Sequence, residues 1–421
     1  MRAMYIKIAV AFFILISFRP SSAQQLTIEE CYDKARQNYP LIKQKELIAK
    51  SKEFTIENVK AGLLPQVSLM GQASYQSDVT RLPGPAVLLE SLSKDQYKVY
   101  LDVNQSIYDG GVVKRNSVLQ ETVSMVEDQK IEVELYKIKE RINQIYFGAL
   151  LINEQLVQID LVKKDIETSL LKMESAIRNG TAFRTNADIL QAELLKTDQR
   201  AVEFKAARKS YLDMLGMFIH QSLTESTDLQ KPQTLIIQSE PVISRPEISL
   251  YNYQSQLYAA QQQVNNTRVT PRLSLFAQGG YGRPGLNMLL NEFDTYYIGG
   301  LRFSWNLGGY YNANRDKQIL DLNLRSVNQQ KETFLFNTQL SLQQQNNELS
   351  KLSELIEIDE KLIELRVRIK NTAKSQLDNG VITANDYLRE LNAEDQAMQN
   401  LSVHQIQLLM TQYSKQVTTG N

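Results

Sequence analysis

The residue types that most often carry chemistry are scarce in this chain and lie far apart. It contains two histidines, His220 and His404, and one cysteine, Cys31. Zinc sites and Cys-His or Ser-His-Asp catalytic centres need several such side chains within reach of one another. We therefore expect no metal site, no cofactor and no enzymatic activity. Cys31 lies in a helical pattern, where it is expected to be a small apolar packing residue.

One glycine-rich motif matches the dinucleotide-binding fingerprint, with glycines at 280, 282 and 285 after a predicted strand. The fingerprint works only where a helix opens at the motif, and here Pro284 lies inside it and no helical pattern begins there. We therefore interpret the motif as a cell-surface loop between strands. Lys and Arg together number 47, as do Asp and Glu, so charge offers no case for nucleic acid binding.

Two aspartates follow Asn-Gly turns at matched places. After each turn, a threonine and an aspartate are expected to begin a returning helix, where an acidic residue complements the helix dipole and caps free N–H groups. The two sets are Asn179, Gly180, Thr185 and Asp188, then Asn379, Gly380, Thr383 and Asp386.

The elements that position these residues occur twice. Residues 40–75 recur weakly at 246–281 with a constant offset, so that Pro40 returns as Pro246 and Pro65 as Pro271. Each copy begins with a polar helix, breaks at a proline and continues into alternating apolar and polar residues. A repeat that covers about half of the chain predicts two structural units of the same design.

Residues 1–23 have the pattern of a secretory signal. Arg2 and Lys7 precede an apolar run at 8–18, and Ser21 and Ala23 are small residues at the cleavage position, so that Gln24 would begin the mature chain. The alternative is a membrane-spanning helix, for which the run is shorter than the roughly 20 residues required. No later segment approaches that length. Cleavage would lower the net charge from zero to about −3.

The predicted order of elements is the same in both repeats. The first repeat, 24–220, has a helix at 27–62 interrupted near Pro40, strands at 65–76 and 97–108, and helices at 112–178 and 185–218. A linker at 221–245 follows. The second repeat, 246–417, has a helix at 246–267, strands at 271–281 and 296–307, and helices at 312–378 and 383–415, before a tail at 418–421.

The four predicted strands alternate strictly between apolar and polar residues. In the first, Val67, Leu69 and Tyr75 share one face while Ser68 and Gln72 share the other. This pattern suits a membrane barrel with lipid outside and water inside, and equally a soluble, half-buried hairpin. The expected strand–helix junctions are at Pro65, Gly110, Gly111, Pro271, Gly308 and Gly309.

The two long helices carry apolar stripes typical of coiled coils. From Ile131 to Ile177 apolar residues recur at alternating steps of four and three, broken only by Lys163. Such a repeat of 3.5 residues indicates left-handed coiled-coil packing. The second long helix is richer in Gln and Asn, which indicates one wet side. Its stripe consists of Leu355, Ile358, Leu362, Leu365 and Ile369.

Together these features resemble the bacterial outer membrane efflux proteins of the TolC type, over essentially the whole mature chain. The resemblance rests on the order and spacing of several short segments. They are Leu26-Thr27-Ile28-Glu29-Glu30, Ala61-Gly62-Leu63-Leu64-Pro65, Arg245-Pro246-Glu247, the two Asn-Gly turns, Asp188-Ile189-Leu190-Gln191-Ala192 and Asp386-Tyr387-Leu388.

The resemblance implies an α+β membrane protein in the outer membrane with a periplasmic extension. Three copies would form a homotrimer, each giving four strands to one twelve-stranded β-barrel continued by a helical barrel. It would be the passive exit duct of a tripartite efflux or type I secretion system, contacting outer-membrane lipid. Its partners would be a periplasmic adaptor protein and an inner-membrane pump, either proton-driven or of the ABC type.

The resemblance also implies roles for residues near the Asn-Gly turns. The adaptor would dock at Asn179, Gly180, Thr181, Asn379, Gly380 and Thr383, and the pore constriction would involve Asp386, Asp188 and Arg389. Arg389 stands where the family has a second aspartate, and Ile382 stands where well-known members have an arginine. The alternatives are an adaptor-like or other secreted coiled-coil protein and, less well supported, a secreted enzyme on a helical scaffold.

Overall fold

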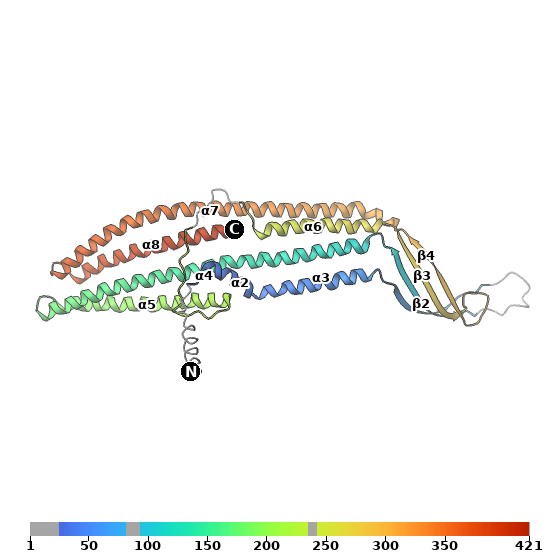
Figure 1. The fold of residues 1–421 in the computed structure, drawn as a ribbon, viewed down its shortest axis with the longest axis horizontal. Helices are drawn as coiled ribbons and strands as arrows, with labels where there is room; N and C mark the ends of the chain where they lie inside the picture. Colours follow the sequence, from blue (N-terminus) through green and yellow to red (C-terminus); the bar gives the residue numbers. More distant parts are fainter. Residues whose placement is uncertain (1–24, 81–92, 235–241, 421) are drawn as a thin grey trace, which may run out of the picture. The chain divides into compact units, whose positions relative to one another are not determined.

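The structure is a computed structural model that describes residues 25–80, 93–234 and 242–420 (Figure 1). The signal sequence predicted at 1–23 lies outside these residues. The chain divides into two compact units. Unit 1 comprises 1–42, 134–245 and 335–421, and unit 2 comprises 43–133 and 246–334. Each sequence repeat contributes to both units, so the boundary between the units does not coincide with the boundary between the repeats.

Unit 2 contains one antiparallel sheet with the strand order β1-β2-β3-β4. The strands are β1 (Gln66–Tyr75), β2 (Asp95–Tyr108), β3 (Arg272–Arg283) and β4 (Asp294–Ser304). Since β3 runs to Arg283, the first part of the glycine-rich motif is strand, not the loop expected from the sequence. Glycine is required there because a Cβ atom on Gly280 would lie 2.6 Å from the Cβ of Tyr100.

The last strand is shorter than the sequence pattern predicts. We expected it to reach 307, but β4 ends at Ser304 and Leu307–Gly309 forms a 3-10 turn. The indole N–H of Trp305 donates to the carbonyl of Val269 at 2.9 Å, which draws the chain out of the strand. Apolar alternation continues through Trp305 and Leu307, so the pattern alone could not locate this end.

The register of the sheet separates an apolar face from a polar one. Leu69 pairs with Leu101, and Leu275 pairs with Leu301, on one face. Ser68 pairs with Asp102 on the other. The apolar side chains are exposed in the single chain, Leu69 by 76 %. Among the described residues, β1 and β4 each pair with only one neighbouring strand, so each leaves one edge of backbone groups without a strand partner.

The strands meet the helices of unit 2 at turns of two kinds. Gly110 and Gly111 have φ angles of 71° and 83°, which favour glycine, and the Asp109 carboxylate caps the next helix by accepting from the N–H of Val113 at 2.7 Å. Gly308 and Gly309 belong to the 3-10 turn and have no positive φ. Gly309 instead allows close approach, since a Cβ would lie 3.0 Å from Val269. Pro65 and Pro271 directly precede β1 and β3.

Unit 2 also includes α3 (Gln44–Ala61), α6 (Pro246–Asn266) and the first parts of two long helices. These long helices are α4 (Val112–Arg178) and α7 (Tyr310–Asp378), and their remaining parts belong to unit 1. A short 3-10 turn at Thr267–Val269 joins α6 to β3.

Unit 1 consists of two helical hairpins and a short N-terminal helix. Figure 1 shows α4 beside α5 (Arg184–Ile219) and α7 beside α8 (Ala384–Thr419). The N-terminal helix α2 (Ile28–Asn38) ends before a 3-10 turn at Pro40–Lys43, where the sequence predicts an interruption. Since α8 continues to Thr419, it includes the first two residues of the predicted tail, 418 and 419.

The α4 stripe that the sequence predicts forms part of the core of unit 1, together with buried residues of α5 and α8. Ile142, Ile159 and Ile166 are at most 1 % exposed, and Lys163, the one break in the stripe, pairs with Asp198 on α5 at 2.6 Å. Cys31 is fully buried, which raises the pKa of its thiol to about 12 and is consistent with a packing role.

Most of the stripe predicted on α7 is exposed in the single chain. The buried apolar residues of this part of α7 are Leu352, Ile363, Ala373 and Leu377, whereas Ile358 and Leu365 are exposed. The heptad pattern therefore marks a packing surface of α7 that this chain leaves uncovered. The physical reason is that a 3.5-residue pattern identifies an apolar stripe but not the helix that covers it.

One stretch of α4 corrects a second expectation. It is apolar enough over 18 residues to cross a membrane by length and composition, although the sequence suggested that no segment after the signal approaches a span. The packed face of a core helix meets the same criterion, so this stretch does not by itself define a membrane span.

Candidate functional site

The two helical hairpins of unit 1 end in turns with the same backbone design. Gly180 and Gly380 have φ angles of 75° and 70°, and each follows the last turn of a long helix. The N–H of Thr181 bonds the carbonyl of Ala176 at 2.9 Å, and the N–H of Gly180 bonds that of Ile177 at 3.0 Å. This is the Schellman motif, and Val381 and Gly380 repeat it in the second turn. We call residues 175–187 the first tip and residues 375–387 the second tip.

The second tip begins its returning helix with a complete capping box. The Thr383 hydroxyl accepts from the N–H of Asp386 at 3.2 Å, and the Asp386 carboxylate accepts from the N–H of Thr383 at 3.2 Å. The Thr383 hydroxyl also donates to the Asp386 carboxylate at 2.7 Å, and this bond, with the one from the Thr383 N–H, holds the pKa of Asp386 below its ordinary value. In the single chain, Asp386 therefore stabilises the start of α8, as its position after the turn predicts.

The first tip begins its returning helix differently from our expectation. The N-cap of α5 is Phe183, which makes no side-chain capping bond. Thr185 and Asp188 lie inside the helix, so Asp188 is not the counterpart of Asp386. Counting from the two glycines, that counterpart is Asn186. Thr185 and Asp188 have the spacing of a helix start. The sequence pattern therefore placed the N-cap at Thr185, two residues after its position in the structure.

Asn186 joins the two tips. Its side-chain oxygen accepts from the backbone N–H of Ala384, the first residue of α8, at 3.3 Å. An otherwise unpartnered N–H group of one hairpin is thereby satisfied by the other. Reasoning from the sequence did not single out Asn186. Its place six residues after Gly180, equal to that of Asp386 after Gly380, is the signal that could have found it.

A groove of about 620 Å³ lies beside the second tip, between α7 and α8. It brings together two of the three predicted constriction residues, Asp386 and Arg389, while Asp188 lies on the other hairpin. Arg389 is exposed and pairs with Glu390 at 3.0 Å. The other lining residues are Arg368, Ile369, Thr372, Ala373, Gln376, Ile382 and Glu390.

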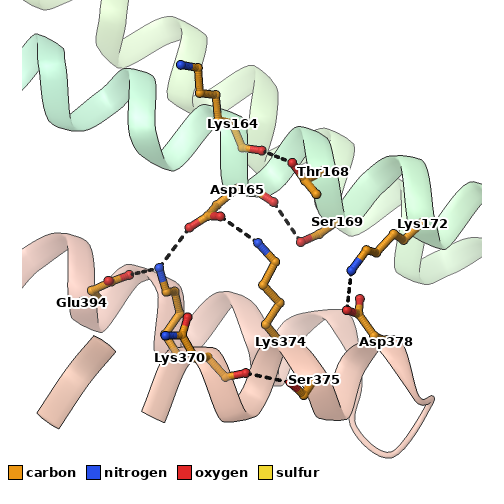
Figure 2. Close-up of polar contacts among 11 residues, drawn as sticks. Lys164, Asp165, Thr168, Ser169, Lys172, Lys370, Lys374, Ser375, Asp378 and Glu394 are labelled. Atoms are coloured by element: carbon orange, nitrogen blue, oxygen red, sulfur yellow. Dashed lines mark hydrogen bonds and ion pairs between the residues drawn. The ribbon is translucent and has the colours of Figure 1, made fainter. Parts of the chain in front are cut away.

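Above the tips, a polar network joins the two hairpins (Figure 2). Asp165 on α4 accepts from Lys370 at 3.0 Å and from Lys374 at 2.8 Å, both on α7. Lys370 also pairs with Glu394 on α8 at 2.9 Å. Nearer the turn, Lys172 on α4 pairs with Asp378 on α7 at 2.6 Å. Nothing in a single sequence pairs residues that lie about 200 positions apart.

The surroundings of this network favour its charged form. Burial would raise the pKa of Asp165, but hydrogen bonds from Lys374 and Lys370 outweigh burial and lower it. Burial would lower the pKa of Lys370, but hydrogen bonds to Glu394 and Asp165 outweigh burial and raise it. The network therefore links the hairpins most strongly between the acidic and the strongly alkaline range. Among the described residues, no group of three or more His, Cys, Asp and Glu side chains is placed to hold a metal ion.

Comparison with solved structures identifies this fold. It matches the outer membrane protein VceC from Vibrio cholerae with a TM-score of 0.68 and 13 % sequence identity, over 94 % of this chain and 96 % of that one. It matches the open state of the Neisseria gonorrhoeae MtrE outer membrane channel with a TM-score of 0.67 and 13 % identity, over 94 % and 89 %. The Campylobacter jejuni CmeC outer membrane channel matches with a TM-score of 0.64 and 14 % identity, over 93 % and 85 %.

No protein-family model and no curated protein matches the chain. The likeness to solved structures therefore establishes the fold. Four antiparallel strands and two long helical hairpins per chain form a TolC-like fold, as the sequence predicts.

Proposed function

We propose that this chain is the outer-membrane exit duct of a tripartite efflux or type I secretion system. Three copies would close their strands into one twelve-stranded barrel in the outer membrane, with the helices extending into the periplasm. The duct would conduct small molecules or proteins passively and perform no chemistry. A periplasmic adaptor would dock at the tips, and an inner-membrane pump, proton-driven or of the ABC type, would supply the energy.

The observation that carries this proposal is that the chain leaves matching surfaces uncovered. Among the described residues, the sheet has two unpaired edges and an exposed apolar face. An open edge cannot persist in lipid, where every backbone group must be paired within the protein. Closing the sheet with further copies of itself removes the edges. The exposed apolar stripe of α7, including Ile358 and Leu365, is then available to pack on a neighbouring copy.

The tip residues fit the proposal in specific ways. Three copies of Asp386 would form a ring of carboxylates at the narrow end, with Arg389 one helical turn further along α8 and Asp188 on the neighbouring hairpin. Such a ring favours cations. The exposed turns at Asn179-Gly180-Thr181 and Asn379-Gly380, with Thr383, would receive the adaptor.

Cell fractionation tests the proposed function against an adaptor-like or other secreted coiled-coil protein. We expect the chain in the outer-membrane fraction, extractable only with detergent, as an oligomer that migrates differently in gel electrophoresis before and after boiling. Recovery as a water-soluble periplasmic protein would contradict the proposal. The fold already disfavours an adaptor, since it carries two long hairpins and a sheet with one predominantly apolar face.

A further inference from the structure

The two tips share a backbone but present different side chains at their ends. Matching positions are 200 residues apart, and at one of them the first tip has Phe183 where the second has Thr383. Thr383 caps its helix, whereas Phe183 makes no capping bond and is 82 % exposed. The first tip therefore displays an aromatic ring at the position where the second tip stabilises its helix.

An exposed phenylalanine is unfavourable at an N-cap for two reasons. The N-cap prefers Ser, Thr, Asp or Asn because a side-chain oxygen can accept from the N–H groups of the first turn. The ring also leaves apolar surface in water. Nothing among the described residues packs over the Phe183 ring to offset these costs. Positions where a local stability rule is broken without a gain inside the chain are typically functional.

The charge of the two tips differs as well. The first tip contains Arg178 and Arg184 and no acidic residue, although Glu174 and Asp188 directly flank it; the second contains Asp378 and Asp386 and no basic residue, although Lys374 directly precedes it. Neither arginine has an ion pair among the described residues, and both are exposed. The first tip is therefore an aromatic ring flanked by two available guanidinium groups, and Phe and Arg are residue types enriched at protein interfaces.

A second copy of the chain is the less suitable occupant. The acidic groups at the matching tip, Asp378 and Asp386, are already engaged within the chain. Asp378 pairs with Lys172 at 2.6 Å, and the Asp386 carboxylate accepts from both the N–H and the hydroxyl of Thr383. The chemistry therefore favours a different protein.

We propose that the first tip is the principal docking point for a protein partner whose surface offers an apolar pocket rimmed by acidic side chains. The pocket takes the ring of Phe183, and its carboxylates pair with Arg178 and Arg184. The second tip contributes less. This inference rests on the proposed function. The two tips have the same backbone, and the inference states which of them the periplasmic partner binds.

Photocrosslinking in the native host tests this assignment. The photoreactive residue p-benzoylphenylalanine is placed at 183 or, as a control on the second tip, at Val381, an exposed apolar residue that takes no part in the capping by Thr383. We expect ultraviolet light to join position 183 to a polypeptide other than this chain, at an apolar segment flanked by acidic residues. The yield at position 381 should be at least about fivefold lower. A crosslink to another copy of this chain, equal yields at both positions, or no crosslink at 183 would overturn the proposal.

A second variant separates docking from folding. Phe183→Thr installs the cap that the second tip already has, so the apparent melting temperature should stay the same or rise by about 1–2 °C. The crosslinked partner should nevertheless co-purify at least about tenfold less, while Val381→Thr retains it. Undiminished partner recovery with Phe183→Thr would overturn the inference alone, provided that the variant still forms the heat-modifiable outer-membrane oligomer. If the unaltered chain itself did not form that oligomer, the result would instead contradict the proposed function.

Discussion

Lys374 on α7 lies 2.8 Å from the carboxylate of Asp165 on α4, although 209 residues separate them in the sequence. Lys370 approaches the same carboxylate at 3.0 Å, so one aspartate receives two lysines. The side chain of Lys370 is 13 % exposed and is shared with Glu394. This contact ties one helical hairpin to the other within a single copy.

Replacing Asp165 by Asn should destabilise unit 1. The substitution leaves two partly buried lysines without their carboxylate, and hydrogen bonds to charged groups typically contribute about 1.5–3 kcal/mol. We expect a lower midpoint in denaturant, measured by circular dichroism at 222 nm on the detergent-solubilised protein. The control is Glu357→Gln, which removes a fully exposed pair with Lys361 within one helix and should change little. An unchanged midpoint for Asp165→Asn would show that the network adds nothing to stability.

The same network should limit stability at both ends of the pH range. The pKa of Asp165 is lowered on folding, so its contribution is complete above the ordinary value of 3.8 and is lost as the pH falls further. The pKa of Lys370 is raised, so its contribution is complete below 10.5 and is lost as the pH rises further. Melting temperatures recorded from pH 3 to pH 11 should therefore be constant between these two values and fall outside them. Asp165→Asn should reduce the fall at acidic pH. If the melting temperature of Asp165→Asn fell at acidic pH as much as that of the original chain, Asp165 would not be the group responsible for the acid decline.

The apolar face of the sheet should reject charge, and the polar face should accept it. Leu101→Arg places a guanidinium on the apolar face, where an arginine at the membrane midplane costs roughly 2–4 kcal/mol. Ser68→Arg places the same group on the polar face opposite Asp102. We expect the first variant to reduce the amount of boiling-sensitive oligomer in the outer membrane and the second to leave it near the original level. Equal tolerance of both substitutions would exclude a lipid-facing surface.

The glycine of the second tip should resist substitution for a conformational reason. Gly380 has φ of 70° and no atom within 4 Å of where a Cβ would lie, so only backbone strain opposes a side chain there. Alanine should cost about 1–2 kcal/mol, and asparagine, which tolerates this region better, should cost less. Thermal melting of both variants measures the difference. If alanine and asparagine behaved alike, strain at Gly380 would not be the cause.

Asp386 offers a test of the proposed constriction. In planar lipid bilayers, Asp386→Asn should reduce the preference of the channel for cations, since three carboxylates would be neutralised together. Asn can still accept from the N–H of Thr383, so the helix start is largely preserved. Asp188→Asn serves as the comparison on the other hairpin. Unchanged ion selectivity with Asp386→Asn would reduce the role of this carboxylate to capping.

The sequence predicts the regular elements of this fold better than their ends and partners. The bounds of α4 follow from a continuous apolar stripe without proline, and the strands follow from alternation. The start of α5 does not, because Thr185 and Asp188 imitate a helix start that the backbone places at Phe183. The end of β4 depends on the bond from Trp305 to Val269, a contact that alternation does not encode.

The candidate site was predictable only in part. The Asn-Gly turns are local signals, and the structure gives both glycines a positive φ. The network around Asp165 and the bridge from Asn186 to Ala384 are contacts between segments about 200 residues apart. Only the three-dimensional structure reveals such contacts. The α7 stripe was recognised, but its pattern could not tell a partner within the chain from one in another copy.

The most direct test of the account counts the copies that close the sheet. In a Cys31→Ser background, cysteines introduced on the edge strands at Met70 of β1 and Ile298 of β4 are oxidised in the outer membrane and resolved without reductant. We expect a ladder of crosslinked species that ends at three chains, because a closed ring leaves no free edge. A ladder that stops at two chains, continues beyond three, or never forms would contradict a sheet completed by three copies.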